Sequence, residues 1–92
     1  MNLLKGRYRR KDPHESGTFE EDLLVMHTET LDTMVLNPTA AALWEALKWP
    51  QSVNDLTDLL IEAFPEKNEE SLRAHVREVV ETLLSRKLLI KV

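Results

Sequence analysis

The pattern of apolar and polar positions predicts short strands in the first part of the chain. Leu23 to Met26 is a compact apolar run of strand length, and a second segment runs from Leu31 to Leu36, where polar and apolar residues nearly alternate between Leu31 and Met34. Turn-favouring residues lie between them, so we expect an antiparallel pair joined near residues 28–32. Thr18-Phe19-Glu20 indicates a third, shorter strand. Because a hairpin is marginally stable alone, this unit must pack on the segments that follow.

Three helices are predicted after the strands. The first begins with Asn37 as N-cap and Pro38 in the first helical position, where no backbone donor is missed. The second begins with Ser52 as cap and Asp55 three residues on. The third is expected over residues 69–86. Each helix has an apolar stripe at three- and four-residue steps. The stripes consist of Ala40, Leu43, Trp44 and Leu47; Val53, Leu56, Leu60, Ala63 and Phe64; and Leu72, Val76, Val79, Val80 and Leu83.

The order of elements predicts an α+β fold. Leu88-Leu89-Ile90 is a final apolar run, expected as a short strand or an extended end over the core. The second and third helices, joined by a brief turn that contains a proline, resemble a helix-turn-helix pair. We therefore expect one winged-helix-like domain over residues 18–92, with an N-terminal two- or three-stranded antiparallel sheet followed by a three-helix bundle.

Residues 1–17 have no helical or strand periodicity and are predicted to form a flexible basic arm, or a loosely docked extended segment. The arm holds five of the twelve basic residues, Lys5, Arg7, Arg9, Arg10 and Lys11, uninterrupted by an acid. The remainder is acidic, and the net charge of the chain is -4. An acidic body repels phosphate backbones, so nucleic-acid binding is not favoured. The arm could steer an acidic partner or exchange between two copies in a domain-swapped homodimer.

Little in the sequence predicts catalysis. The 92 residues include no cysteine, and the three histidines, His14, His27 and His75, lack a second metal ligand at helical spacing. The sequence has no nucleophile elbow, phosphate loop or dinucleotide fingerprint. We predict a protein that is not an enzyme and has no cofactor or metal site. No apolar run approaches the roughly 20 residues that span a bilayer, so a cytoplasmic location is expected.

The stretch VLNPTAAALW, from Val35 to Trp44, is similar to the hallmark of the PqqD family. These are small proteins of pyrroloquinoline quinone biosynthesis, and the same domain is known more widely as the recognition element of ribosomally made, modified peptides. The resemblance covers roughly residues 18–90. Three positions depart from it. The family usually has an acidic residue and a glycine where this chain has Trp49-Pro50, an aspartate at His75, and a glycine at Lys87. Which pathway the chain serves is therefore left open.

The resemblance implies a function for surfaces. In such domains a leader peptide adds as a strand to the edge of the small sheet, in a cleft walled by the third helix. Carried onto this sequence, the edge consists of Thr33, Met34, Val35 and Leu36, and the wall of Leu72, His75, Val76, Val79 and Leu83. The resemblance implies two partners, a precursor peptide and a radical SAM or other peptide-modifying enzyme. The chain would then be a non-catalytic peptide chaperone.

Two other functions stay open on the sequence alone. One is an acidic winged-helix transcription regulator that would hold DNA through the basic arm. Its expected recognition helix, residues 69–86, has three arginines against four glutamates, which is the wrong sign for a groove lined by phosphates. The other is a docking domain detached from a larger enzyme, with no peptide of its own.

Overall fold

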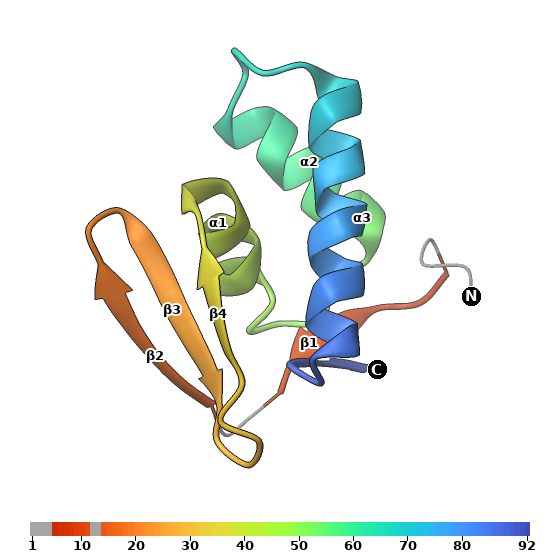
Figure 1. The fold of residues 1–92 in the computed structure, drawn as a ribbon. Coiled ribbons are helices and arrows are strands. Elements are labelled where there is room, and N and C mark those ends of the chain that lie inside the picture. The colour runs from red at the N-terminus through yellow and green to blue at the C-terminus, as the bar shows by residue number, and fades with distance from the viewer. Residues whose placement is uncertain (1–4, 12–13) are drawn as a thin grey trace.

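A computed structural model describes residues 5–11 and 14–92 (Figure 1). The chain forms strands and helices in an order that confirms the expected α+β class. In sequence they are β1 (Tyr8–Arg10), β2 (His14–Phe19), β3 (Asp22–His27), β4 (Thr33–Leu36), α1 (Pro38–Ala46), α2 (Val53–Ala63), α3 (Glu69–Ser85) and β5 (Leu89–Lys91).

The strands form two small sheets. One is three-stranded in the order β2-β3-β4, and the other pairs β1 with β5. In the larger sheet Val25 lies opposite Met34, as expected for a hairpin joined near residues 28–32. Its inner face packs on the helices through Val25, Leu36 and the nearly buried His27. Figure 1 shows this sheet as a layer beside α1, with β4 between β3 and α3.

The helix starts follow the sequence closely. Asn37 Oδ1 accepts from the amide of Ala40 at 2.9 Å, and Pro38 takes the first helical position. At the start of α2, Ser52 and Asp55 form a reciprocal capping box with both hydrogen bonds at 3.0 Å. These side chains satisfy amides that the first helical turn leaves without a partner. The predicted caps are therefore confirmed.

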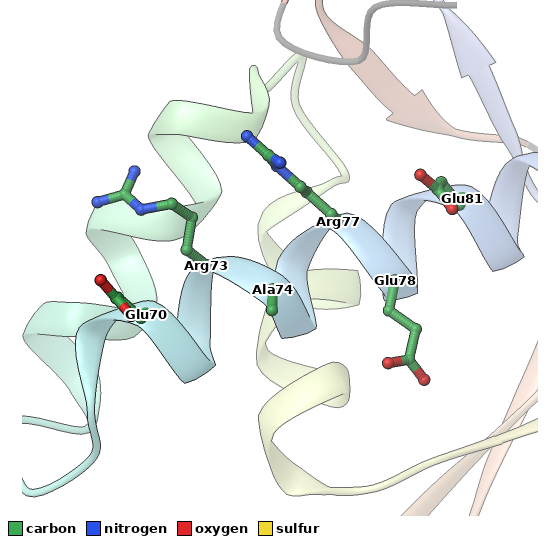
Figure 2. A pocket seen from close by; sticks show the side chains of 6 residues that line it. All are labelled: Glu70, Arg73, Ala74, Arg77, Glu78 and Glu81. Carbon is green, nitrogen blue, oxygen red and sulfur yellow. The ribbon is translucent and has the colours of Figure 1, made fainter.

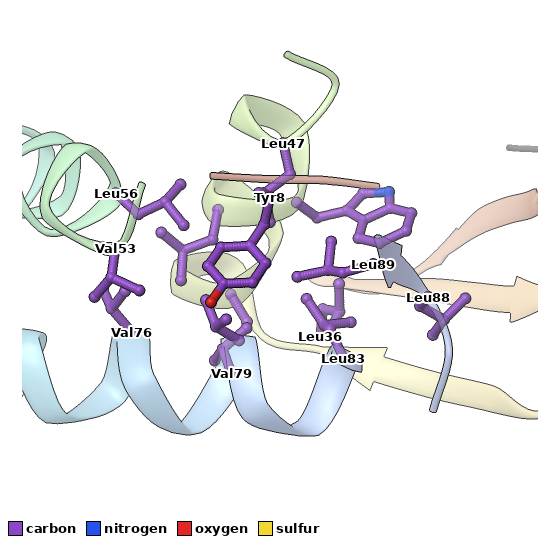
Figure 3. Close-up of a cluster of buried hydrophobic side chains, with 14 of the residues drawn as sticks. Tyr8, Leu36, Leu47, Val53, Leu56, Val76, Val79, Leu83, Leu88 and Leu89 are labelled. Carbon is purple, nitrogen blue, oxygen red and sulfur yellow. The ribbon is translucent and has the colours of Figure 1, made fainter. Parts of the chain in front are cut away.

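The core lies where the three helices meet the two sheets. Trp44 is 1% exposed and belongs to the same buried cluster as the apolar residues of α2 and α3. Figure 3 shows Val53 of α2 opposite Val76 of α3 in this cluster. Each fully buried aliphatic side chain contributes roughly 1.5–3 kcal/mol relative to an exposed one. The core thus uses most of the helical positions that the periodicity identified. Ala63 is exposed and Phe64 is only partly buried, because the stripe of α2 leaves the core at its C-terminal end.

The N-terminal segment differs from the expected arm. Residues 8–10 form β1, and β2 crosses the expected boundary between residues 17 and 18. Tyr8 is 0% exposed, and its ring points into the core beside Val79 in Figure 3. Its amide donates to the carbonyl of Gln51 at 2.8 Å, while β5 pairs on the other edge of β1. The prediction of an arm without regular structure is therefore wrong for residues 8–10 and 14–17, because tertiary pairing supplies the order that local periodicity lacks.

Candidate functional site

The outer edge of β4 presents open backbone groups. The amide of His27 donates to the carbonyl of Asp32 at 3.0 Å, directly before β4 begins. Because bonded pairs alternate along an antiparallel ladder, the amide and carbonyl of Met34 face β3, whereas those of Thr33 and Val35 face outward. In the described part of the chain no strand pairs with this edge, since β4 is the last strand of its sheet.

Helix α3 forms a wall beside this edge. Between β4 and α3 lies a groove with a hollow of about 190 Å³. Its lining residues come from β4, the start of α1 and one stripe of α3: Met34, Val35, Leu36, Asn37, Ala40, His75, Glu78, Val79 and Thr82. The lining is apolar beside the strand, and it becomes polar where Glu78 and Thr82 reach toward solvent.

A second hollow continues the groove toward the loop between α2 and α3. It has about 230 Å³ and shares Asn37 and His75 with the first. Its remaining lining residues are Thr39, Lys67, Ser71 and Leu72. The groove is therefore apolar along β4. Beyond the end of the strand it is polar, and Lys67 adds a positive charge there. His75 lies at the junction, and its Nε2 atom is buried without a hydrogen-bond partner in the described residues.

The opposite end of the groove is closed by an ion pair. Arg86, at the C-terminal end of α3, donates from Nη1 to Asp32 Oδ1 at 3.0 Å. The same nitrogen is 3.5 Å from the carbonyl oxygen of Thr33. This contact confirms that the carbonyl of Thr33 points outward from the sheet. Of the outward groups on β4, the amide and carbonyl of Val35 and the amide of Thr33 remain open to an added strand.

A family model described as "Coenzyme PQQ synthesis protein D (PqqD)" matches residues 22–89, which covers most of the chain. The chain belongs to the PqqD family. The match includes β3, β4 and all three helices, and therefore both walls of the groove. No curated protein matched the chain.

A solved structure, "TbiB1 in Complex with the TbiA(beta) Leader Peptide", has a similar fold. It shares 15% identity with this PqqD-family chain at a TM-score of 0.73. The similarity covers 88% of this chain and 93% of the other. At this identity the comparison establishes a common fold.

The structure brings together only part of the expected site in this PqqD-family chain. Thr33, Met34, Val35 and Leu36 form β4, and His75 and Val79 face it across the groove. Leu72 lines the second hollow instead. Val76 and Leu83 are 0% exposed and belong to the core, so the structure removes them from the expected wall.

The residues that sequence reasoning missed lie on a neighbouring stripe of α3. Glu78 and Thr82 follow His75 at three- and four-residue steps and line the groove. Sequence reasoning chose the most apolar stripe of the helix, which faces the core. Val79, at 7% exposed, borders both stripes. The signal that could have found Glu78 and Thr82 was their helical spacing from His75.

A larger hollow lies elsewhere, on the outward face of α3. It has about 510 Å³, and all of its lining residues come from that single helix, Glu70, Arg73, Ala74, Arg77, Glu78 and Glu81. Figure 2 shows the two arginines projecting from one side of α3 and Glu78 pointing away from them. With a single helix as its wall, this hollow is a surface depression between long side chains. We therefore place the candidate site at β4.

Other kinds of site find little support in residues 5–11 and 14–92. Within these ranges no three histidine or acidic side chains come together as metal ligands. None of the helices there has the length and apolar character needed to cross a bilayer.

Asp55 has a lowered pKa because the backbone amide and then the hydroxyl of Ser52 donate to its carboxylate, which is a capping arrangement.

Proposed function

We propose that this chain is a non-catalytic peptide chaperone of the PqqD family. It binds the leader segment of a ribosomally made precursor peptide as a strand added to β4. It then presents that peptide to a modifying enzyme, by family resemblance a radical SAM protein. The observation that carries the proposal is the open outer edge of β4 with α3 beside it.

The edge of β4 suits an added strand better than the other outer edge of the same sheet. An unpaired strand edge is a template for a guest backbone. In β2, five of the six residues are exposed and no helix flanks them, so a guest there would bury little apolar surface. At β4, the guest would lie between Val35 and the wall formed by His75 and Val79. The apolar wall distinguishes the two edges.

Magnitudes explain why this wall is necessary. Three or four backbone bonds at a net of about 1 kcal/mol each do not outweigh an ordering cost of about 1–2 kcal/mol per residue. Apolar guest side chains must supply the difference, at about 1.5–3 kcal/mol for each one fully buried. We therefore expect the bound leader segment to carry apolar side chains at alternate positions, which face the groove.

The bound peptide in the solved TbiB1 structure supports this proposal. That protein is in complex with a leader peptide, and its fold is shared over 88% of this chain. Membership of the PqqD family also supports the proposal of a peptide-binding protein. The proposal does not distinguish pyrroloquinoline quinone biosynthesis from the pathway of another modified peptide.

Titration of the isotope-labelled full chain with a synthetic leader peptide tests the proposal. The probe is the leader of a short precursor encoded beside this chain, with a scrambled version as control. We expect the native leader peptide to shift the amides of residues 33–37 and 75–82, and the scrambled peptide to leave them unchanged. Shifts confined to the outward face of α3 or to the edge of β2 would refute strand addition at β4.

The alternative of a DNA-binding regulator is not favoured by the structure. The outward face of α3, which would enter a groove, presents Arg73 and Arg77 together with three glutamates. Negative charge on that face repels phosphate. The alternative of a detached docking domain stays a prediction, and a negative titration with every candidate leader would favour it.

A further inference from the structure

The structure joins the two ends of the described chain into one basic surface. We call residues 5–11 and 87–92 the basic ribbon. Backbone hydrogen bonds connect its two halves at both ends. Val92 N–H donates to the carbonyl of Arg7 at 2.8 Å, and Lys11 N–H donates to the carbonyl of Leu88 at 2.8 Å. Between them Arg9 lies opposite Ile90 in the β1–β5 ladder. Figure 1 shows the two strands side by side near the C-terminal end of α3.

The ribbon concentrates positive charge. It holds seven of the twelve Lys and Arg residues and none of the sixteen Asp and Glu residues. The rest of the chain, with five basic and sixteen acidic residues, carries a charge of -11. Several cations of the ribbon are engaged within the molecule, since Arg10 and Lys11 each lie 3.9 Å from a glutamate oxygen and Arg9 donates from Nη1 to the carbonyl of Arg10 at 3.4 Å. Arg7, Lys87 and Lys91 are exposed.

Apolar side chains accompany the charge on the outer face of the ribbon. Because side chains alternate along a strand, the burial of Tyr8 and Leu89 turns Arg9 and Ile90 outward. Ile90 is 37% exposed and Val92 is 65% exposed. The outer face of the ribbon thus combines arginine with aliphatic side chains, and arginine is enriched at protein interfaces.

An exposed tryptophan lies close in sequence to the residue that pairs with the far edge of β1. The far edge of β1 pairs with Gln51, whose amide donates to the carbonyl of Tyr8 at 2.9 Å. Two residues earlier, Trp49 is 66% exposed. Exposed tryptophans are over-represented among the residues that dominate binding energy at interfaces. At Trp49-Pro50 this chain also departs from the usual family sequence.

We propose that the basic ribbon is a second docking surface, which binds an acidic and partly apolar surface of another protein. If the proposed function holds, that protein is the peptide-modifying enzyme. The body of the chain repels a nucleic acid, whereas an acidic protein surface can match the ribbon locally. A second copy of the chain also has an acidic body, and the dependence of the ribbon shifts on protein concentration distinguishes that occupant from another protein. The ribbon does not line the β4 groove, so both surfaces can be occupied together.

The test uses the isotope-labelled full chain and three defined probes. These are a short peptide of alternating Glu and Leu, the same peptide with Ser in place of Leu, and a short DNA duplex. We expect the Glu–Leu peptide to shift amides of the ribbon and to change the fluorescence of Trp49 in a Trp44→Phe background. Binding should weaken as salt is raised, and the Ser peptide should bind more weakly.

Charge reversal locates the site. The double variant R7E/R9E should weaken Glu–Leu peptide binding by about tenfold or more. The matched control R73E/R77E has the same charge change on the outward face of α3 and should retain binding within about twofold. If R7E/R9E fails to fold, R7Q/R9Q removes the charge while keeping similar side-chain size, and the same ranking applies.

Several outcomes would overturn the inference. Equal affinity for the Ser and Leu peptides would show that the ribbon binds acidic peptides through charge alone, without an apolar contribution. Tighter binding of the DNA duplex would assign it to nucleic acid, and ribbon shifts on raising the protein concentration alone would assign it to a second copy. Shifts at residues 33–37 with none in the ribbon would also refute it while leaving the β4 site intact. Conversely, ribbon shifts without any leader binding at β4 would refute only the proposed function.

Discussion

Arg86 and Asp32 form an ion pair of 3.0 Å that ties the C-terminal end of α3 to the start of β4. The pair lies 54 residues apart in sequence, and its guanidinium also contacts the carbonyl of Thr33. It therefore occupies one of the outward backbone groups that a guest strand would use. The ion pair sets where the open edge of β4 begins.

Removing this contact should extend the open edge. Arg86→Ala frees the carbonyl of Thr33, and one additional net bond of about 1 kcal/mol raises leader affinity by up to about fivefold. Because the ion pair is exposed, the free energy of unfolding should fall by less than about 1 kcal/mol. Calorimetric titration and urea unfolding measure the two effects. Lys48→Ala, which breaks another exposed pair, is the control, and a large loss of affinity in Arg86→Ala would mean that the arginine itself contacts the guest.

The alternation of inward and outward backbone groups along β4 predicts different effects of proline at Val35 and at Met34. Val35→Pro removes an outward amide, so the sheet should survive while leader affinity falls by about tenfold or more. Met34→Pro removes an amide that faces β3 and should destabilise the protein more than Val35→Pro does. Circular dichroism and urea unfolding give the ranking of stabilities, and amide-shift titration gives the affinities.

Val35→Thr is the control, because it keeps the backbone amide and the branched shape. Its affinity for the leader should stay within about threefold of the parent. Equal stability of the two proline variants would show that the outward groups of β4 have been assigned wrongly. Full affinity in Val35→Pro would show that the leader does not pair with this strand.

Local signals predicted most of the fold, and a non-local contact accounts for the strand that was missed entirely, β1. The caps at Asn37 and Ser52 and the hairpin of β3 and β4 depend on neighbouring residues, so the sequence contains their signatures. Strand β1 has one apolar residue, Tyr8, and its order comes from pairing with β5, at the other end of the chain. No periodicity can reveal such a pairing.

The site was predicted in part for a related reason. The family resemblance placed the edge strand at Thr33 to Leu36, and these residues form β4 at the outer side of the sheet. The wall needed the rotation of α3 about its axis, which only packing determines. A shift of one helical stripe separates the buried Val76 from His75, which lines the groove. Apolar character selected the core stripe, and the groove stripe is more polar.

His75 should limit stability at the centre of the groove. Its buried Nε2 atom lacks a partner in the described residues, which is unfavourable for a polar group. Replacing the ring with an apolar side chain, His75→Leu, should raise the free energy of unfolding by up to about 1 kcal/mol. Urea unfolding measures this change, with the exposed Arg73→Leu as control. A loss of stability in His75→Leu would show that the imidazole makes a favourable hydrogen bond.

The capping box of α2 predicts a dependence of stability on pH. The pKa of Asp55 is lowered chiefly by the Ser52 amide and then by its hydroxyl, with Arg7 as a further favourable charge. A depressed folded-state pKa stabilises the protein above the unfolded pKa, and this contribution disappears as pH falls below about 4. Asp55→Asn should therefore flatten the acid limb of unfolding free energy against pH, whereas Glu62→Gln, in the same helix, should not. An unchanged slope in Asp55→Asn would contradict the assignment.

Lys87 gives a stability prediction that does not involve the groove. The end of α3 closes with two hydrogen bonds, from Leu88 N–H to the carbonyl of Leu83 at 2.9 Å and from Lys87 N–H to that of Leu84 at 3.0 Å. This pattern places Lys87 in the left-handed position of a Schellman motif, and its φ is 60°. The family usually has glycine there, which adopts such a φ without steric cost.

Lys87→Gly should therefore raise the free energy of unfolding by about 1 kcal/mol, because relief of the left-handed strain exceeds the added chain entropy of glycine. The matched control is Lys67→Gly, at a position without a positive φ, where the added chain entropy and the loss of the cation–π contact with Phe64 should lower stability. Thermal and urea unfolding of both variants measure the difference. If both glycines lowered stability alike, steric strain at Lys87 would not be relieved by glycine, and the departure from the family would have no energetic consequence at this helix end.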